Sequence, residues 1–205
     1  LKYAVDTDGD GDAGVVIEES ADNNTIFLYA ANKADGRNAA EGRDKAYIRK
    51  IDGRTGTVAW TKTFDASAEN AGGAYAPVHI GKNELNGTII ASLSAAALND
   101  GTDGGLIIAL DKSTGEEKWR VEQADGIWSA PVVIYDENGK GYILQCDRGG
   151  KLTLYSGIDG QAMCSIDLGS RIESTPAVFN NTLVVGTRGV DGSGQGPKIV
   201  GIRIG

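Results

Sequence analysis

The stretch Leu106–Ile134, LIIALDKSTGEEKWRVEQADGIWSAPVVI, contains the pattern that decides the fold. An apolar strand is followed by a turn that closes with Thr114-Gly115, and Trp119 stands four residues after the glycine. A second short strand and a turn of small residues then lead into another apolar run, which begins with Ala130-Pro131. Because the same pieces recur elsewhere, the sequence indicates an array of one supersecondary unit.

Two elements recur in phase along the chain. An apolar strand led by Ala or Thr begins each unit, at Ala13–Ile17, Ala76–Ile80, Ala130–Ile134 and Thr175–Phe179. An Asp-to-Gly turn precedes Trp60 and Trp119, whereas the third copy has Gly160 followed by Cys164. Four short strands joined by tight turns form one antiparallel sheet, which cannot bury both of its faces alone. Stacking such sheets around an axis solves this, so we expect an all-β propeller of four-stranded antiparallel blades. A β-sandwich with coincidental turns is the alternative.

The repeat boundaries predict a single propeller domain over residues 1–205. Blade-like repeats are expected at about 13–65, 74–122, 127–168 and 172–205, with residues 1–5 as an isolated outer strand. Two arrangements stay open: a closed four-blade ring, and a four-blade piece of a ring of seven or eight blades. In either, Trp60 and Trp119 are expected to pack between neighbouring blades, because a buried indole removes a large apolar surface from water.

Composition limits the function. The chain has 205 residues, of which 40% are hydrophobic, and this is enough for a core. Its net charge of −8 and pI of about 4.7 disfavour nucleic acid and anionic lipid surfaces, and they permit cations and neutral ligands such as glycans. No apolar run approaches the roughly 20 residues of a membrane-spanning helix, so we expect no membrane insertion. The start at Leu1 rather than Met indicates a mature product or a fragment.

The unit resembles the quinoprotein-type propeller repeat, also called the pyrroloquinoline-quinone-like repeat. Ser129–Val133 matches its start, Gly149–Leu152 its middle, and Leu110-Asp111 with Thr114-Gly115 and Trp119 its end. The resemblance covers most of the chain and implies the propeller fold. It implies less about activity, because the fold hosts both enzymes and binding scaffolds, among them a bacterial outer-membrane assembly lipoprotein without a cofactor.

Enzymes of this family hold the quinone against a Trp floor and a Ca²⁺, and they use an adjacent-cysteine disulfide and an acidic base. Here Cys146 and Cys164 are not adjacent, and no such set is matched residue by residue. The resemblance therefore makes pyrroloquinoline quinone an unexpected cofactor, and no catalytic residue is predicted. We expect both cysteines to be buried thiols, too far apart for a disulfide, and His79 to be a structural residue.

An acidic loop is the sharpest local signal. Asp6, Asp8, Asp10 and Asp12 alternate with Thr7, Gly9 and Gly11. Such oxygen-rich loops wrap hard cations, and the spacing matches the start of an EF-hand loop, although Ile17 stands where the bidentate Glu belongs. The loop predicts a Ca²⁺ site with a structural role. A solvated acidic turn is the alternative.

A second candidate site lies just before the first strand of each unit. Tyr75, Trp128 and Glu173 occupy equivalent places there, and Arg148 and Arg171 lie nearby by the repeat. Aromatic, arginine and carboxylate side chains at the mouth of a central channel are suited to stack on and hydrogen-bond a sugar or quinone. Channel-lining packing and ion pairs are the alternative.

The sequence favours a non-catalytic propeller module of an extracellular or cell-surface protein, which binds protein or glycan; a periplasmic location also fits. A rival hypothesis is a quinone-dependent dehydrogenase-like enzyme or a fragment of one. A third is an assembly module that pairs through open blade edges, either with itself or with the remainder of a larger propeller.

Overall fold

The computed structural model describes residues 2–20, 24–37, 39–40, 42–189 and 196–204. Its strands are β1 Val16–Glu19, β2 Ile26–Ala31, β3 Arg43–Asp52, β4 Val58–Ser67, β5 His79–Ile80, β6 Thr88–Ala97, β7 Asp103–Asp111, β8 Glu117–Gln123, β9 Val132–Tyr135, β10 Gly141–Cys146, β11 Lys151–Ser156, β12 Ala162–Asp167, β13 Ala177–Phe179, β14 Thr182–Thr187 and β15 Lys198–Arg203. One short 3-10 helix, Asn83–Leu85, lies between β5 and β6. Among the described residues, no helix has the length and apolar character needed to span a bilayer.

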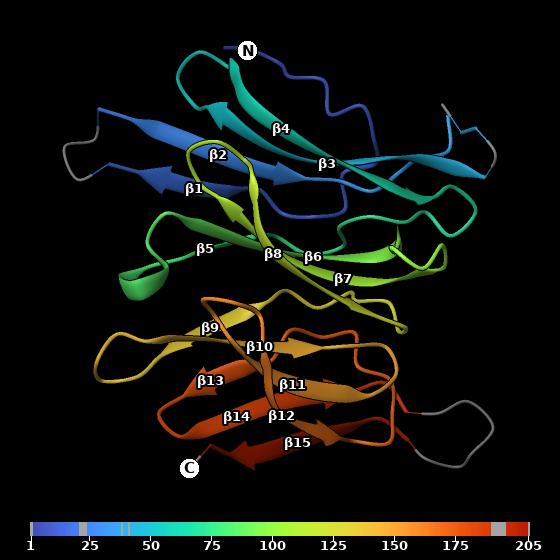
Figure 1. The fold of residues 1–205 in the computed structure, drawn as a ribbon, viewed down its shortest axis with the longest axis vertical. Helices are drawn as coiled ribbons and strands as arrows, with labels where there is room; N and C mark the ends of the chain where they lie inside the picture. Colours follow the sequence, from blue (N-terminus) through green and yellow to red (C-terminus); the bar gives the residue numbers. More distant parts are fainter. Residues whose placement is uncertain (1, 21–23, 38, 41, 190–195, 205) are drawn as a thin grey trace.

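The strands form successive antiparallel blades, as predicted. Blade 1 is β1–β4 and blade 2 is β5–β8, and the single pair Ala66–Ala96 joins them into one continuous sheet path. Blade 3 is β9–β12, and the described strands of blade 4 are β13–β15. The blades are layered from the N-terminus to the C-terminus (Figure 1). The all-β propeller class is therefore confirmed.

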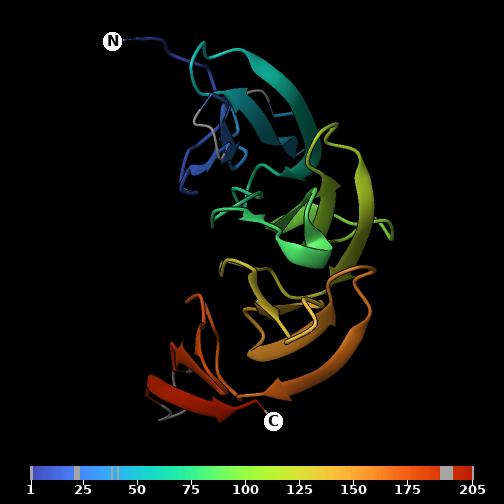
Figure 2. The same ribbon diagram turned by 90° about the vertical axis from the view of Figure 1, so that its left-hand side faces the viewer.

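The blades follow an open arc, with the two chain ends at its opposite tips (Figure 2). The described residues thus form part of a ring, and the alternative of a closed four-blade ring is wrong for this structure. Blade 1 and blade 4 each have one face that no other blade covers. Both faces carry exposed apolar side chains, including Ile17 in β1 and Ile199 in β15.

Three apolar clusters lie between successive blades. The first joins blades 1 and 2 through residues such as Tyr29 and Ile108. The second joins blades 2 and 3 around Ile107 and Ile143, and the third joins blades 3 and 4. Side chains alternate between the two faces of a strand, so an inner blade needs apolar residues on both faces. This explains why β6 and β7 are buried along nearly their whole length.

The first strand of each blade is shorter than the sequence predicted. In blades 2, 3 and 4 it begins only after Pro77, Pro131 and Pro176, because proline has no N–H to donate to a β-ladder. Residues 2–5 also differ from the expectation, since they form no strand. A strand needs a hydrogen-bonded neighbour, and no described segment lies beside residues 2–5 in a β-ladder.

Candidate functional site

Aromatic rings dock neighbouring blades onto each other. Trp60 in β4 lies against Gly115 in the β7–β8 turn, and Trp119 in β8 lies against Gly160 in the β11–β12 turn. A Cβ added to either glycine would come within 2.7 Å of a ring carbon. Each indole Nε1 also donates to the carbonyl three residues before that glycine, at 3.1 Å. Both tryptophans therefore lie in the joints between blades.

Tyr3 makes the same joint, which the sequence reasoning missed. Its ring lies against Gly56 in the β3–β4 turn, where an added Cβ would again come within 2.7 Å. Its hydroxyl donates to the carbonyl of Gly53, three residues before that glycine, at 2.7 Å. Tyr3 thus takes the place that a tryptophan takes in the later joints. A signal was present, because the spacing from Tyr3 to Gly56 is close to that from Trp60 to Gly115.

The joint between blades 3 and 4 lacks an aromatic ring. Cys164 stands at the tryptophan position of β12 and is exposed, so the expectation that both cysteines are buried is wrong for this one. It borders a hollow of about 200 Å³ that is lined mainly by leucine and isoleucine side chains of blades 3 and 4. Its small side chain leaves open the space that an indole fills elsewhere. Cys146 is buried in β10, and both thiols are free.

In the structure, basic side chains approach the carboxylates of the acidic loop. Asp8 pairs with Arg49 at 2.7 Å, while Asp10 and Asp12 pair with Lys33 at 3.3 and 2.5 Å. Asp6 accepts the backbone N–H of Asp8. Among the described residues, no group of three or more acidic, cysteine or histidine side chains converges as a metal site. Lys33 and Arg49 of blade 1 therefore balance part of the negative charge of the loop, and the Ca²⁺ site stays a prediction.

The predicted ligand-binding residues do come together, in a ladder of side chains along one edge of the arc. Lys33 lies 4.7 Å from the centroid of the Tyr75 ring, and the Tyr75 and Trp128 rings stack at 4.7 Å with an angle of 16°. The guanidinium of Arg148 covers Trp128 at 4.0 Å. Arg148 then reaches Glu173 of the next blade. The ladder thus runs through residues of all four blades.

Three arginines surround the carboxylate of Glu173 at the end of this ladder. Arg148, Arg171 and Arg188 approach the same oxygen, Oε1, at 3.3, 3.8 and 3.4 Å. Sequence reasoning missed Arg188, which follows β14. The backbone N–H of Arg188 donates to the carbonyl of Arg171 at 2.8 Å, and this bond holds the two arginines side by side. We call Arg148, Arg171 and Arg188 the arginine cluster.

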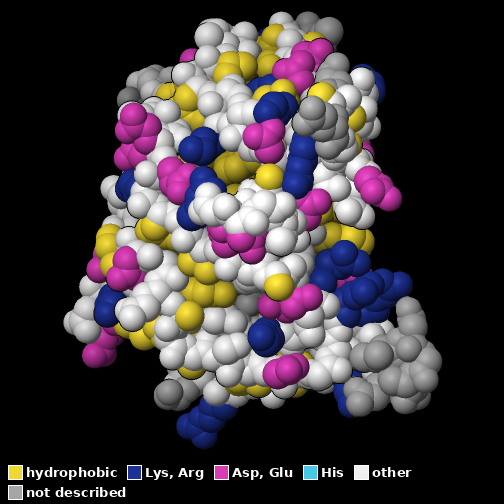
Figure 3. All heavy atoms as spheres, turned by 45° about the vertical axis from the view of Figure 1, so that its right-hand side comes forward, with side chains coloured by type: hydrophobic (Ala, Val, Ile, Leu, Met, Phe, Trp, Pro, Cys, Tyr) yellow, Lys and Arg dark blue, Asp and Glu magenta, His cyan; other side chains and the backbone are white. Residues whose placement is uncertain are grey.

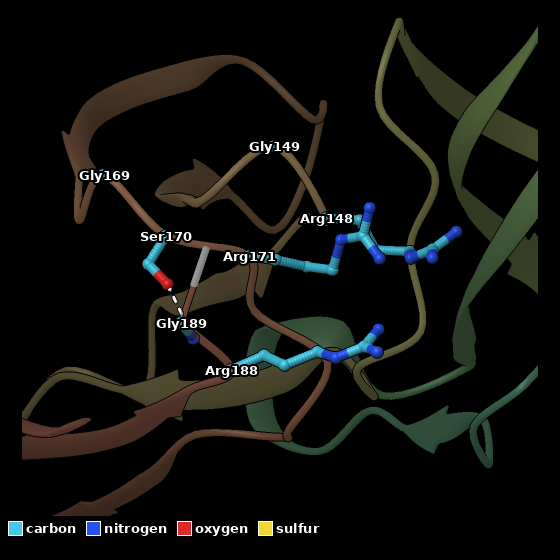
Figure 4. A pocket seen from close by; sticks show the side chains of 7 residues that line it. All are labelled: Arg148, Gly149, Gly169, Ser170, Arg171, Arg188 and Gly189. Atoms are coloured by element: carbon cyan, nitrogen blue, oxygen red, sulfur yellow. Dashed lines mark hydrogen bonds between the residues drawn. The ribbon is translucent and has the colours of Figure 1, made fainter. Parts of the chain in front are cut away.

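The arginine cluster lines a hollow of about 350 Å³, together with Ser170 and three glycines. Figure 4 shows the three arginine side chains extending toward the same side of this hollow, and Ser170 accepting a hydrogen bond from Gly189. A dense group of basic side chains is also visible at the lower right of Figure 3, on a face where acidic ones are scattered. Three guanidinium groups share the Glu173 carboxylate, and the Asp125 carboxylate lies beside Gly149 of the same hollow, so positive charge is still in excess there.

The ionisable groups beside the ladder have shifted pKa values. Burial alone would lower the pKa of Lys33, but its hydrogen bonds with Asp12 and Asp10 and its charge interactions with Tyr75 and Asp12 outweigh burial and raise it. Burial raises the pKa of Asp147, which precedes Arg148. Its carboxylate accepts the backbone N–H of Lys151, which fixes the β10–β11 turn. His79 is half-buried in β5, away from the ladder, and burial lowers its pKa.

The residues present do not fit a quinone cofactor. Trp128 is already stacked on Tyr75 and covered by Arg148, so its indole is not a free floor for a planar ring. Trp60 and Trp119 lie in the joints between blades. Both cysteines are free thiols, so the adjacent-cysteine disulfide of the family enzymes has no counterpart here.

Comparisons with known proteins agree with this repeat. The family profile of the glucose/ethanol/alcohol dehydrogenase β-propeller domain matches residues 45–143. The profile of the outer membrane protein assembly factor BamB matches residues 107–197. A comparison with curated protein sequences found no match.

Solved structures share the fold at low sequence identity. BamB from Moraxella catarrhalis is 16% identical with a TM-score of 0.54, and the match covers 92% of this chain and 45% of that one. Quinohemoprotein alcohol dehydrogenase from Comamonas testosteroni is 12% identical with a TM-score of 0.58, over 83% and 36%. The computationally designed Ika4 protein is 16% identical with a TM-score of 0.50, over 94% and 92%.

The chain spans less than half the length of the BamB and dehydrogenase structures that it matches. At these identities the likeness shows the fold alone. Together, the two profiles and the repeated blade and joint identify the repeat itself. The chain belongs to the β-propeller family built from the pyrroloquinoline-quinone-like repeat.

Proposed function

We propose that this chain is a non-catalytic binding module that holds an acidic segment of a protein partner at the arginine cluster. The observation that carries this proposal is the concentration of three guanidinium groups around one carboxylate, beside a hollow of about 350 Å³. The whole chain has a net charge of −8, so this local excess of positive charge stands against the general composition. Guanidinium groups bind carboxylates through paired hydrogen bonds, which suits aspartate and glutamate side chains of a partner.

The geometry favours a protein segment over a neutral glycan. A sugar binds such sites by stacking on an open aromatic face, and Trp128 is already in contact with Tyr75 and Arg148. Arg171 and Arg188 are still 43% and 52% exposed, so they have donors available to a ligand. The match to the profile of an outer membrane protein assembly factor supports a role among other proteins, and with it a periplasmic or cell-surface location.

The proposal is tested by titrating the chain calorimetrically with an oligoglutamate peptide and with an oligoglutamine peptide of equal length. We expect binding of the acidic peptide only, weakening as salt is added. The double variant Arg171→Ala/Arg188→Ala should bind about tenfold more weakly or worse, from two lost pairs of up to about 1 kcal/mol each. Arg37→Ala, which removes an exposed arginine of blade 1, is the matched control. Equal binding of both peptides, or an equal loss in the control, would overturn the proposal.

A quinone-dependent dehydrogenase is the second candidate, and the match of residues 45–143 to the dehydrogenase propeller profile supports it. The covered Trp128 argues against it. Adding pyrroloquinoline quinone and Ca²⁺ to the chain, with an alcohol or glucose and a redox dye, separates the two functions. We expect no reduction of the dye, and sustained turnover would favour the enzyme.

A further inference from the structure

The joint formed by Tyr3 differs from the other two in one respect. Trp60 and Trp119 each stand on the outermost strand of a blade and dock that blade onto the next. Tyr3 docks onto blade 1 in the same geometry, with its hydroxyl on Gly53, but residues 2–5 belong to no sheet. Tyr3 therefore lies where a fourth strand places its joint residue, although residues 2–5 pair with no described strand.

The opposite tip of the arc offers the complementary feature. Blade 4 has three described strands, and β15 pairs on one edge only, with β14. An unpaired edge presents free backbone donors and acceptors to an incoming strand. In blades 1, 2 and 3 the equivalent edge of the third strand pairs with a fourth strand. That fourth strand carries the residue at the joint, which is Trp60, Trp119 or Cys164. Residues 2–5 carry that position, at Tyr3.

The outward faces of the two tips also match. In blade 4, the register places Ala177, Val184 and Gly201 in one row on the outward face, and Phe179 and Ile199 on the same face are 80% and 79% exposed. Inside the arc, the equivalent faces are covered by the next blade and form the apolar clusters. An exposed apolar face of this kind marks an interaction surface.

Blade 1 presents the counterpart of that surface. Its outward face carries the row Ile17, Leu28 and Ile51, in which Ile17 is 60% exposed. Charge is complementary as well, since the exposed Glu19 ends β1 on this face and the exposed Arg203 ends β15 at the corresponding end of blade 4. The outward faces of blade 4 and blade 1 thus correspond to the two faces that pack against each other between neighbouring blades of the arc.

We propose that a second copy of this chain docks head to tail on the outward face of β13–β15, with its residues 2–5 paired along β15 as the fourth strand. The contact is heterologous, so two copies use both of their tips and close into one ring when the arc subtends about half a turn. Figure 2 shows the blades in an open arc, with one free tip at each end of the chain. The pairing repeats the interface that already joins blades 1, 2 and 3. It does not depend on the ligand of the arginine cluster.

Light scattering coupled to size-exclusion chromatography tests the proposal at micromolar concentration and about 0.15 M salt, where the like net charges of two copies are screened. We expect a mass of twice 21.3 kDa. Phe179→Glu/Ile199→Glu should give a mass of 21.3 kDa, and because both side chains are exposed, the far-UV spectrum should not change. Ile158→Glu, a 57% exposed apolar residue in the β11–β12 turn, is the matched control and should leave the dimer intact.

The strand pairing has its own readout. Ala4→Pro removes a backbone N–H from the N-terminal segment, so it should weaken the dimer at least tenfold. Hydrogen exchange in β15 should slow in the dimer and become fast in Phe179→Glu/Ile199→Glu. A single copy at 100 micromolar, a series of higher masses in place of a pair, or a dimer unaffected by the double substitution would each overturn the proposal.

Discussion

The joint between Trp60 and Gly115 makes a quantitative prediction about unfolding free energy. Trp60 is 9% exposed, and replacing it by alanine should cost roughly 3–5 kcal/mol, because a large buried ring is lost. Gly115 has a φ of +75°, where an L-residue costs roughly 1–2 kcal/mol. A Cβ there would also lie 2.7 Å from Cδ2 of Trp60, and this crowding adds roughly 1–3 kcal/mol.

The two substitutions should therefore not be additive. In Trp60→Ala/Gly115→Ala the crowding disappears with the ring, so the double variant should lose roughly 1–3 kcal/mol less than the two single losses combined. Urea unfolding followed by far-UV circular dichroism measures all four corners of the cycle. Gly87→Ala is the matched control, because Gly87 has a φ of +88° and no heavy atom within 4 Å of an added Cβ. The docking geometry would be refuted if the losses from Trp60→Ala and Gly115→Ala added within about 0.5 kcal/mol. It would also be refuted if Trp60→Ala were coupled to Gly87→Ala as strongly as to Gly115→Ala.

Three further predictions concern acid stability, calcium and thiols. Hydrogen bonds from Ser113 lower the pKa of Asp111 to about 2, so the stability that this carboxylate provides is present above its ordinary pKa of 3.8 and is lost as the pH falls toward 2. In Asp111→Asn, the free energy of unfolding should therefore fall less between pH 3.8 and pH 2 than it does in the unchanged protein. An equal fall in both proteins would contradict this prediction. Millimolar Ca²⁺ should leave Tm unchanged, because basic side chains pair with the acidic loop; a clear rise would restore the predicted calcium site. In a thiol-reactive dye, Cys164 should react at once, and Cys146, whose pKa burial raises to about 12, only on unfolding; two fast thiols would contradict this burial.

The sequence predicted the features that repeat. The Gly-x-x-x-Trp spacing identified Trp60 and Trp119 as residues between blades, because the same turn and ring recur at a fixed offset. The equivalent places before each first strand brought Tyr75, Trp128 and Glu173 into one candidate site, and the structure places them in one ladder. Because every unit folds into the same blade, residues at equivalent positions in the sequence lie at equivalent places in successive blades.

Features that depend on a single long-range contact were not visible in the sequence. The acidic loop has a cation-binding pattern, but Lys33 and Arg49 reach it from a later loop and strand. Local spacing carries no information about such partners. Arg188 lies after a strand end with no counterpart in the motif. Tyr3 carried a signal only in its spacing to Gly56. The place of Arg188 beside Glu173 became apparent only once the blades were placed side by side.

The open arc is tested most directly by the distance between its first and last blades. Spin labels at Val58→Cys in β4 and Lys198→Cys in β15, in a Cys164→Ser background, can be measured in an excess of unlabelled protein so that only distances within one copy count. Blade 1 and blade 4 are separated by two blades, or three sheet spacings of about 10 Å, so the account predicts about 30 Å or more. A distance near the spacing of two adjacent sheets, about 10 Å, would contradict it by closing the four blades into a ring.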